Sequence, residues 1–223
     1  MPIFDDGLDP PRPSPDDITH ATLGAVLRWI PGAGEWFSIL YGPPFNRQLE
    51  EWCHTVAVRL RELGSRREFE PTALADNPDF VEVAMAATQA AARTTKEAKR
   101  QALRNAVLNA AVSGEANRIE QQLFVGLTDR LTESHLQLLW VFGDPVKAAS
   151  GAPSIYEARL LLEHAVPAAR RHPDVFDAMW GDLYSAGLVT LPKIDNGLEG
   201  GPQNMHRLTE LGKRYVAFVT TEP

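Results

Sequence analysis

The 223-residue chain contains a single cysteine, Cys53, and no residue pattern that by itself reveals a reaction. One cysteine excludes an internal disulfide and the paired-cysteine spacings of zinc sites, and we expect a protein of the reducing cytoplasm. Positive charge is also in short supply, because 22 Lys and Arg face 29 Asp and Glu and the net charge is -7. Phosphate backbones and anionic membranes repel such a chain, so nucleic-acid binding would need a local basic patch.

Long uninterrupted apolar runs are absent as well. The most apolar segment, ATLGAVLRWIPGAGEWFSILYGPPF at 21–45, is broken by Arg28, by the turn at 31–34 and by Glu35. A membrane-spanning helix needs ~20 uninterrupted apolar residues, so we expect a helical hairpin, with association at a membrane surface as the alternative. The first residues, MPIFDDGLDPPRPSPDD, contain no basic segment followed by an apolar run and predict no signal peptide.

Catalytic and metal-binding motifs are missing. The chain has no Gly-x-Ser-x-Gly elbow, and PGAG at 31–34 lacks the third glycine and the preceding strand of a dinucleotide site. Cys53 and His54 are neighbours on an expected helix and diverge, while Cys53 lies on the apolar face, which favours a packed thiol over a nucleophile. The six histidines are scattered without ligand spacing. We expect no catalytic residues, no metal and no cofactor; the alternative is a site assembled from distant segments.

Helix signals fill the first part of the chain after an acidic, proline-rich tail at 1–13, which we expect to be disordered. Asn77 before Pro78, and Thr94 three residues before Glu97, are N-cap signals. Apolar residues then recur at helical spacing, which predicts an antiparallel helical bundle over 14–131. The expected buried lines are Leu49, Trp52, Cys53, Val56, Leu60 and Leu63; Phe80, Val83, Ala84, Ala87 and Ala91; Ala98, Ala102, Leu103, Ala106, Val107 and Ala110; and Ile119, Leu123, Leu127 and Leu131.

The pattern changes after residue 131. Three helical segments follow, ESHLQLLWVFG, PSIYEARLLLEHAV and PDVFDAMWGDLYSAGLV. Two short strand candidates, LVTLPKI and NMHRLT, flank a turn-rich stretch, and TELGKRYVAFV is a final helix. This order is typical of a winged-helix module, so we predict a mainly α protein whose bundle is followed by a winged-helix-like domain over 132–223 with one small β-hairpin.

Three stretches, EAKRQALRNAVLNAA, FVGLTDRLTESHLQLLWVF and HRLTELGKRYVAFV, carry a family resemblance. In their order and hydrophobic pattern across about residues 80–219, they resemble bacterial helical proteins of the abortive-infection alpha type and related uncharacterised families. Those proteins pair an N-terminal helical region with a winged-helix-like end. The resemblance implies a role in phage defence and carries over no catalytic residues.

The most cationic stretch is TTKEAKRQALRNAVLNAA, residues 94–111. On the expected helix its cations lie opposite the apolar line, as on a solvated face. Cations near a helix N-terminus oppose the helix dipole, however, and Glu97 is the one acid among them. Docking of the acidic tail or of an acidic partner protein, and nucleic-acid contact, are the other interpretations. The candidate electrostatic docking surface comprises Arg93, Lys96, Lys99, Arg100 and Arg104.

A DNA-binding role would rest on cations at the third helix and the wing of the C-terminal domain. That helix carries Asp174, Asp177 and Asp182 without Lys or Arg, and residues 133–223 hold eight Lys and Arg against eleven Asp and Glu. The candidate nucleic-acid contacts are Arg170, Arg171, Lys193 and Arg207. We therefore expect a non-enzymatic protein-interaction or adaptor protein with a protein partner or a second copy of itself. A DNA-binding winged-helix regulator and a membrane-surface effector acting through 21–45 are the alternatives.

Overall fold

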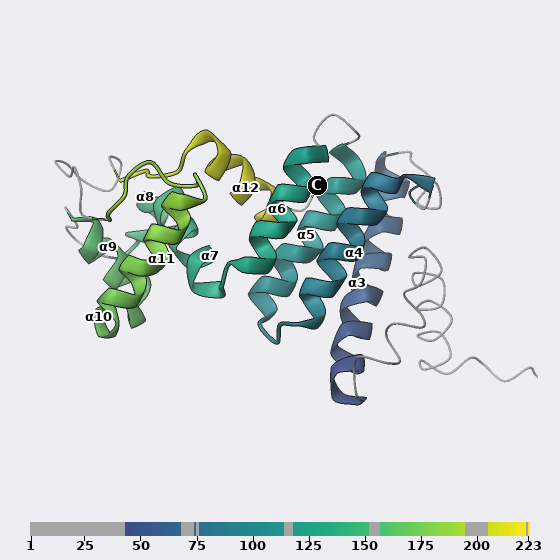
Figure 1. The fold of residues 1–223 in the computed structure, drawn as a ribbon, viewed down its shortest axis with the longest axis horizontal. Coiled ribbons are helices and arrows are strands. Elements are labelled where there is room, and N and C mark those ends of the chain that lie inside the picture. Colours follow the sequence, from purple (N-terminus) through teal and green to yellow (C-terminus); the bar gives the residue numbers. More distant parts are fainter. Residues whose placement is uncertain are drawn as a thin grey trace, which may run out of the picture.

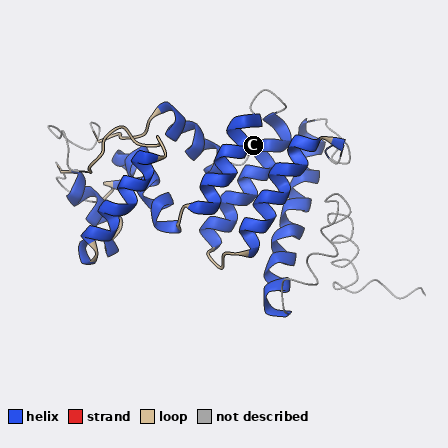
Figure 2. Ribbon diagram, viewed as in Figure 1, coloured by secondary structure: helices blue, strands red, loops and turns tan. Residues whose placement is uncertain are grey.

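The computed structural model describes residues 43–67, 74, 76–113, 118–151, 157–194, 205–221 and 223. Within these residues every regular element is a helix, and Figure 2 draws no strand among them. The prediction of a mainly α protein is confirmed. The expected tail at 1–13 and most of the hairpin segment at 21–45 lie outside the described residues.

Four helices lie side by side at one end of the molecule (Figure 1) and are called the bundle. They are α3 (Pro43–Arg67), α4 (Pro78–Ala92), α5 (Glu97–Ser113) and α6 (Arg118–Arg130). Short connections join α4 to α5 and α5 to α6, so these successive helices run antiparallel. Ala87 and Ala91 of α4 are fully buried, because small side chains let neighbouring helix backbones approach closely.

The predicted apolar face of α3 is confirmed, since all six of its residues from Leu49 to Leu63 are buried. The helix continues past Gly64 and ends at Arg67. The start of α4 is also as predicted: Oδ1 of Asn77 accepts hydrogen bonds from the backbone N–H groups of Asp79 and Phe80. This cap satisfies donors that the first turn of a helix cannot pair internally.

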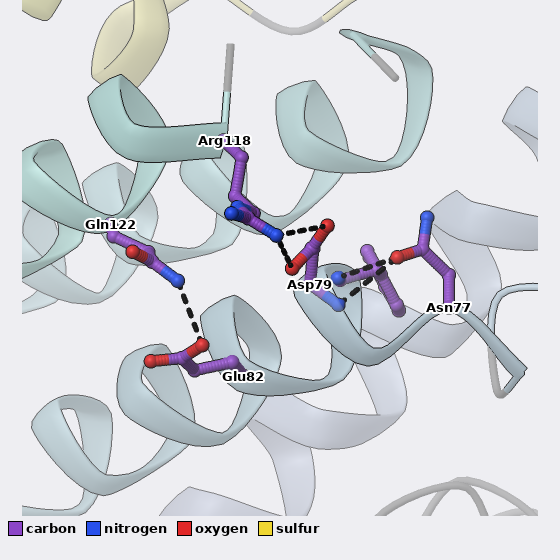
Figure 3. A network of polar contacts seen from close by, with 6 residues as sticks. Asn77, Asp79, Glu82, Arg118 and Gln122 are labelled. Atoms are coloured by element: carbon purple, nitrogen blue, oxygen red, sulfur yellow. Dashed lines mark hydrogen bonds and ion pairs between the residues drawn. The ribbon is translucent and has the colours of Figure 1, made fainter. Parts of the chain in front are cut away.

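A polar seam joins the first turns of α4 and α6, which run parallel to each other (Figure 3). Nη1 of Arg118 lies 3.1 Å from Oδ1 of Asp79, and Nε2 of Gln122 donates to Oε2 of Glu82 at 2.7 Å. At the opposite ends of the same helices, Arg93 pairs with Asp129 at 2.6 Å. Polar pairs therefore mark both ends of the contact between α4 and α6.

The expected buried line on α6 is wrong in its first half. Ile119 is 79% exposed and Leu123 is 46% exposed, whereas Leu127 and Leu131 are buried. The covered face of α6 turns instead toward Phe124, Val125 and Thr128. The rings of Tyr215 and Phe218 each lie 5.4 Å from that of Phe124, so a helix distant in sequence selects the buried face.

The other end of the molecule consists of shorter helices, called the C-terminal body. They are α7 (Glu133–Gly143), α8 (Pro145–Ala148), α9 (Ala158–Ala165), α10 (Ala168–Arg171) and α11 (Pro173–Ser185). Two aromatic rings lie in their core, since Trp180 is fully buried and its ring meets that of Phe142 edge-on at 4.9 Å. Nε1 of Trp180 donates to the Leu191 carbonyl at 2.8 Å, which satisfies the one polar group of the side chain.

The predicted winged-helix module with its β-hairpin is not supported. The two strand candidates meet in one isolated antiparallel bridge, Val189 to Leu208, among the described residues. The next rung of that ladder would need an N–H from Pro192, which has none, and the N–H of Arg207, which donates instead to the Phe142 carbonyl at 3.2 Å. The pairing therefore ends after a single bridge.

Helix α12 (Glu210–Thr220) closes the described fold and lies between the bundle and the C-terminal body (Figure 1). Thr209 caps it, since its Oγ1 accepts from Gly212 N–H at 2.9 Å and donates to the Gly187 carbonyl at 2.6 Å. A Cβ at Gly212 would lie 2.1 Å from the Leu188 carbonyl oxygen, so glycine is required there. The predicted division at residue 131 stays a prediction, although α12 shares contacts with both regions.

Candidate docking groove

Two asparagines of α5 fasten the end of α12 to the bundle. Nδ2 of Asn105 donates to the Val219 carbonyl at 3.0 Å, and Nδ2 of Asn109 donates to the carbonyls of Phe218 and Thr221 at 2.9 and 2.7 Å. The last carbonyls of a helix have no partner within it, so the α5 side chains act as a cap supplied from another helix. The available signal for this role in the sequence is two asparagines four residues apart, Asn105 and Asn109, within the apolar line of α5.

A hydroxyl contact adds to this attachment. The Tyr215 hydroxyl lies 3.1 Å from Oγ1 of Thr128, and both side chains are buried. Burial raises the pKa of the Tyr215 hydroxyl, which therefore stays protonated and available as a donor. On the surface, Nε of Arg214 lies 2.6 Å from Oε1 of Glu120. Helix α12 is thus held to α5 and α6 by polar contacts as well as by its aromatic side chains.

His135 sits at the junction where α6 ends and α7 begins. Its Nδ1 accepts the backbone N–H of Thr132 at 3.1 Å, which closes the first turn of α7. Its Nε2 faces Oδ2 of Asp182 on α11 at 3.5 Å, a long contact. Burial lowers the pKa of His135, and the attraction of Asp182 opposes that shift. The side chain therefore lies between α7 and α11 in its neutral form, and its Nε2 makes no hydrogen bond among the described residues.

A groove of about 470 Å³ lies between α5, α7 and α12. Most of its lining is apolar, and the indole of Trp140, which is 44% exposed, forms part of the wall. The apolar lining residues are Ala98, Ala102, Leu136, Leu139, Trp140, Val216 and Val219. The polar lining residues are Gln101, Asn105, Glu133, Gln137 and Thr220. A concave, mostly apolar site of this volume is in the size range of ligand-binding grooves.

Three of the five predicted docking residues lie near the Glu133 end of this groove, outside its lining. Nζ of Lys96 lies 4.0 Å from Oε2 of Glu133, which lines the groove. Nζ of Lys99 donates to the Asp129 backbone carbonyl, and Arg93 pairs with the Asp129 carboxylate. Burial lowers the pKa of Lys99, while Asp129 acts in the opposite direction. Arg93, Lys96 and Lys99 thus form a basic corner where α5 and α7 begin.

The placement of Arg100 on that surface is wrong. Arg100 is 8% exposed, its Nε donates to the Thr94 carbonyl at 2.9 Å and its Nη2 donates to Oε1 of Gln48 at 2.8 Å. Nε1 of Trp52 in turn donates to the Arg100 carbonyl. Helix α3 covers this side of α5, so the guanidinium is structural. Arg104 is half-buried, and its Nε has no hydrogen-bond partner among the described residues.

The four predicted nucleic-acid contacts do not share one environment. Arg207 is 6% exposed and burial lowers its pKa, so the prediction that it contacts a phosphate is wrong. Its segment runs between Thr190 and the end of α7, where both backbone hydrogen bonds of Arg207 are made. Arg170 pairs with Glu163 at 3.1 Å, while Arg171 and Lys193 are exposed. Acidic neighbours and burial thus weaken the phosphate-binding potential of this set.

The cysteine is packed, as its place on the apolar face of α3 predicts. Cys53 is buried, and this burial raises the pKa of the thiol to about 12, so the thiolate required of a nucleophile is disfavoured. The part of the chain that the structure describes contains no group of three His, Cys, Asp or Glu side chains suited to a metal ion. Nor does any described helix have the length and apolarity to cross a membrane.

Comparison with known proteins does not assign a function to the chain. No family model matches the chain, and neither a curated protein nor a solved structure matches it significantly. The resemblance to abortive-infection proteins therefore stays a prediction. Function has to be inferred from the groove, its basic corner and the chemistry of their side chains.

Proposed function

We propose that this chain is a non-enzymatic protein-interaction or adaptor protein, and that the groove between α5, α7 and α12 is its docking site. The observation that carries the proposal is a 470 Å³ apolar groove with a half-exposed tryptophan in its wall. Exposed aromatic and aliphatic side chains that line a concavity contribute binding free energy when a partner covers them. A protein segment supplies such apolar side chains readily.

The chemistry of the lining supports binding rather than catalysis. Among the described residues that line the groove, Glu133 has the one titratable side chain. General acid–base or nucleophilic catalysis requires cooperating groups within hydrogen-bond reach of a reacting atom. Amides, a threonine and apolar side chains make up the rest of the lining, and such groups position a ligand without reacting with it.

A different protein is a better-supported partner than a second copy. Two features favour a second copy: the small-residue stripes and the hairpin from Trp29 to Tyr41. Ala84, Ala87 and Ala91 of the α4 stripe are buried inside the bundle, and the hairpin lies outside the described residues. A role in bacterial phage defence rests on the sequence resemblance alone and is part of the proposal on that basis. The buried Arg207 and the acidic α11 give the DNA-binding alternative little support, and the segment of the membrane alternative lies largely outside the described residues.

Selection from a random peptide library tests the proposal. Ala98 is exposed and lines the groove, so Ala98→Trp fills it without disturbing a buried position. Ala86 is exposed on α4 and is absent from the groove lining, so Ala86→Trp is the matched control. We expect peptides enriched on the wild-type chain to bind Ala86→Trp equally and Ala98→Trp at least about tenfold more weakly. Failure of the library to enrich, or equal binding to both variants, would refute the proposal.

A further inference from the structure

Two glutamines face the groove from different helices. Gln101 of α5 and Gln137 of α7 both line it, both are exposed, and neither makes a hydrogen bond within the described part of the chain. Asn105, by contrast, uses its amide to cap α12. A primary amide offers two donors and an acceptor, which match the C=O and N–H of a peptide unit. The groove thus carries two amides that are free to bind a main chain.

Amides of this kind select an extended main chain over a helix. In a helix the backbone N–H and C=O groups already pair with each other, whereas an extended segment leaves them available. A helix is also about 10–12 Å across with its side chains, so it could place only side chains in a 470 Å³ groove. Alternate side chains of an extended segment point to one side, toward Leu136, Trp140 and Val216.

Charge differs between the two ends of the groove. Helices α5 and α7 both begin beside Lys96 and Glu133, and helix N-termini carry partial positive charge. Lys99 and Arg93 add cations at this corner, where Asp129 and Glu133 are the paired acids and Glu97 is a third acid in the first turn of α5. At the other end, Val219 and Thr220 belong to the C-terminal turn of α12, which carries partial negative charge. A ligand with a carboxylate directed toward Lys96 complements this distribution.

We infer that the groove binds an extended, largely apolar segment of a partner protein, held along its main chain by Gln101 and Gln137 and oriented by an Asp or Glu side chain directed toward Lys96. This inference rests on the proposed function and adds the chemistry of the partner. The apolar lining contributes affinity, the two amides select the extended backbone, and the basic corner sets the position of the carboxylate.

The peptides selected from the random library are the probe for this inference. We expect their consensus to alternate apolar positions and to place an Asp or Glu at one end. Replacing Gln101 and Gln137 with methionine keeps the side-chain length and removes the amides, so binding should weaken about tenfold or more. Gln89→Met, on an exposed face of α4, is the matched control and should bind as the wild type does. Methylation of alternate main-chain nitrogens of the peptide should weaken its binding to the wild-type chain by a similar factor to the loss of the two glutamine amides.

Charge reversal tests the oriented end. In Lys96→Glu, peptides that carry the acidic residue should bind several-fold more weakly, and versions with lysine at that position should regain affinity. Unchanged affinity in the glutamine double variant, together with tolerance of main-chain methylation, would overturn the inference while leaving the docking groove intact. Selected peptides that bind as helices would overturn it as well. If Ala98→Trp also left peptide binding unchanged, the proposed function would fail with it.

Discussion

The bundle and the C-terminal body bury their apolar surface in different ways. In the bundle, long helices approach through small residues, and Ala87, Ala90 and Ala91 of α4 have almost no exposed surface. In the C-terminal body, the helices are short and surround large rings such as Phe142 and Trp180. Short helices depend on tertiary packing for most of their stability. The bundle therefore buries small side chains where its helices approach closely, whereas the body packs leucines around two large rings.

Helix α12 connects these two kinds of packing. It contacts α5 in the bundle and α7 in the body, and the asparagines of α5 hold its C-terminal end. The groove lies where these three helices meet, at the border between the regions. A change in the position of α12 would alter both the attachment of the two regions and the shape of the groove. The packing that joins the two regions therefore also determines the shape of the groove.

The largest effect should follow from Trp180→Ala. Trp180 is fully buried, its ring meets that of Phe142 edge-on, and its Nε1 donates to the Leu191 carbonyl. Its loss therefore leaves a cavity and an unpaired carbonyl. We expect a decrease of about 3–5 kcal/mol in the free energy of unfolding. Chemical denaturation monitored by circular dichroism measures it. If the body and the bundle unfold together, one transition moves; if they unfold separately, an early transition of the body appears.

Val175→Ala is the control on the same helix. Val175 is exposed on α11, so its truncation should change the unfolding free energy by about 0.5 kcal/mol or less. A Trp180→Ala effect as small as that of Val175→Ala would show that the body does not depend on its aromatic core.

In the bundle we expect overpacking to be the damaging change. Ala87 is fully buried in α4, so Ala87→Leu forces additional atoms between closely packed helices and should cost about 1–3 kcal/mol. The same substitution at exposed Ala86 makes the same change in helix propensity and should be nearly neutral. Equal stability of the two variants in urea would contradict the small-residue account of the bundle.

Helical periodicity predicted the helices and much of the core because burial follows one face of an amphipathic segment. The α3 face and the Asn77 cap follow from local spacing and local hydrogen bonding. Ile119 and Arg100 show where the pattern is insufficient. Ile119 lies on a face that no described helix covers, and Arg100 lies on a face that α3 does cover. Which face is covered depends on contacts between distant segments, and a single helix does not record them.

The groove was still less accessible to sequence reasoning. Its walls come from α5, α7 and α12, and nothing in the spacing of Gln101, Trp140 and Val216 brings them together. The basic stretch named Lys96 and Lys99, which lie near the start of α5, and their role in docking stays a prediction. The predicted β-hairpin does not extend beyond one bridge for a local reason, because Pro192 has no N–H to donate to the second rung of the ladder.

The smallest effect concerns the junction of the two regions and depends on pH. Burial lowers the pKa of His135, the contact with Asp182 raises it, and the charges of Arg130 and Lys99 lower it further. The net pKa in the folded state is below the value of ~6.5 expected in the unfolded chain, so the unfolded state takes up the proton more readily. His135 should therefore contribute full stability above about pH 6.5 and lose part of it as the pH falls toward the folded pKa.

His135→Asn isolates this contribution from the other histidines, because asparagine does not titrate and its oxygen can still accept the Thr132 N–H. Between about pH 7.5 and 5.5, the unfolding free energy of the wild type should fall more steeply than that of the variant. Each unit of pKa depression corresponds to at most about 1.4 kcal/mol of that difference. Equal slopes would mean that His135 does not couple the regions to pH. The opposite result would be a wild type that becomes more stable than the variant as the pH falls. It would mean that attraction between protonated His135 and Asp182 outweighs the cost of burying the charge and of losing Nδ1 as an acceptor.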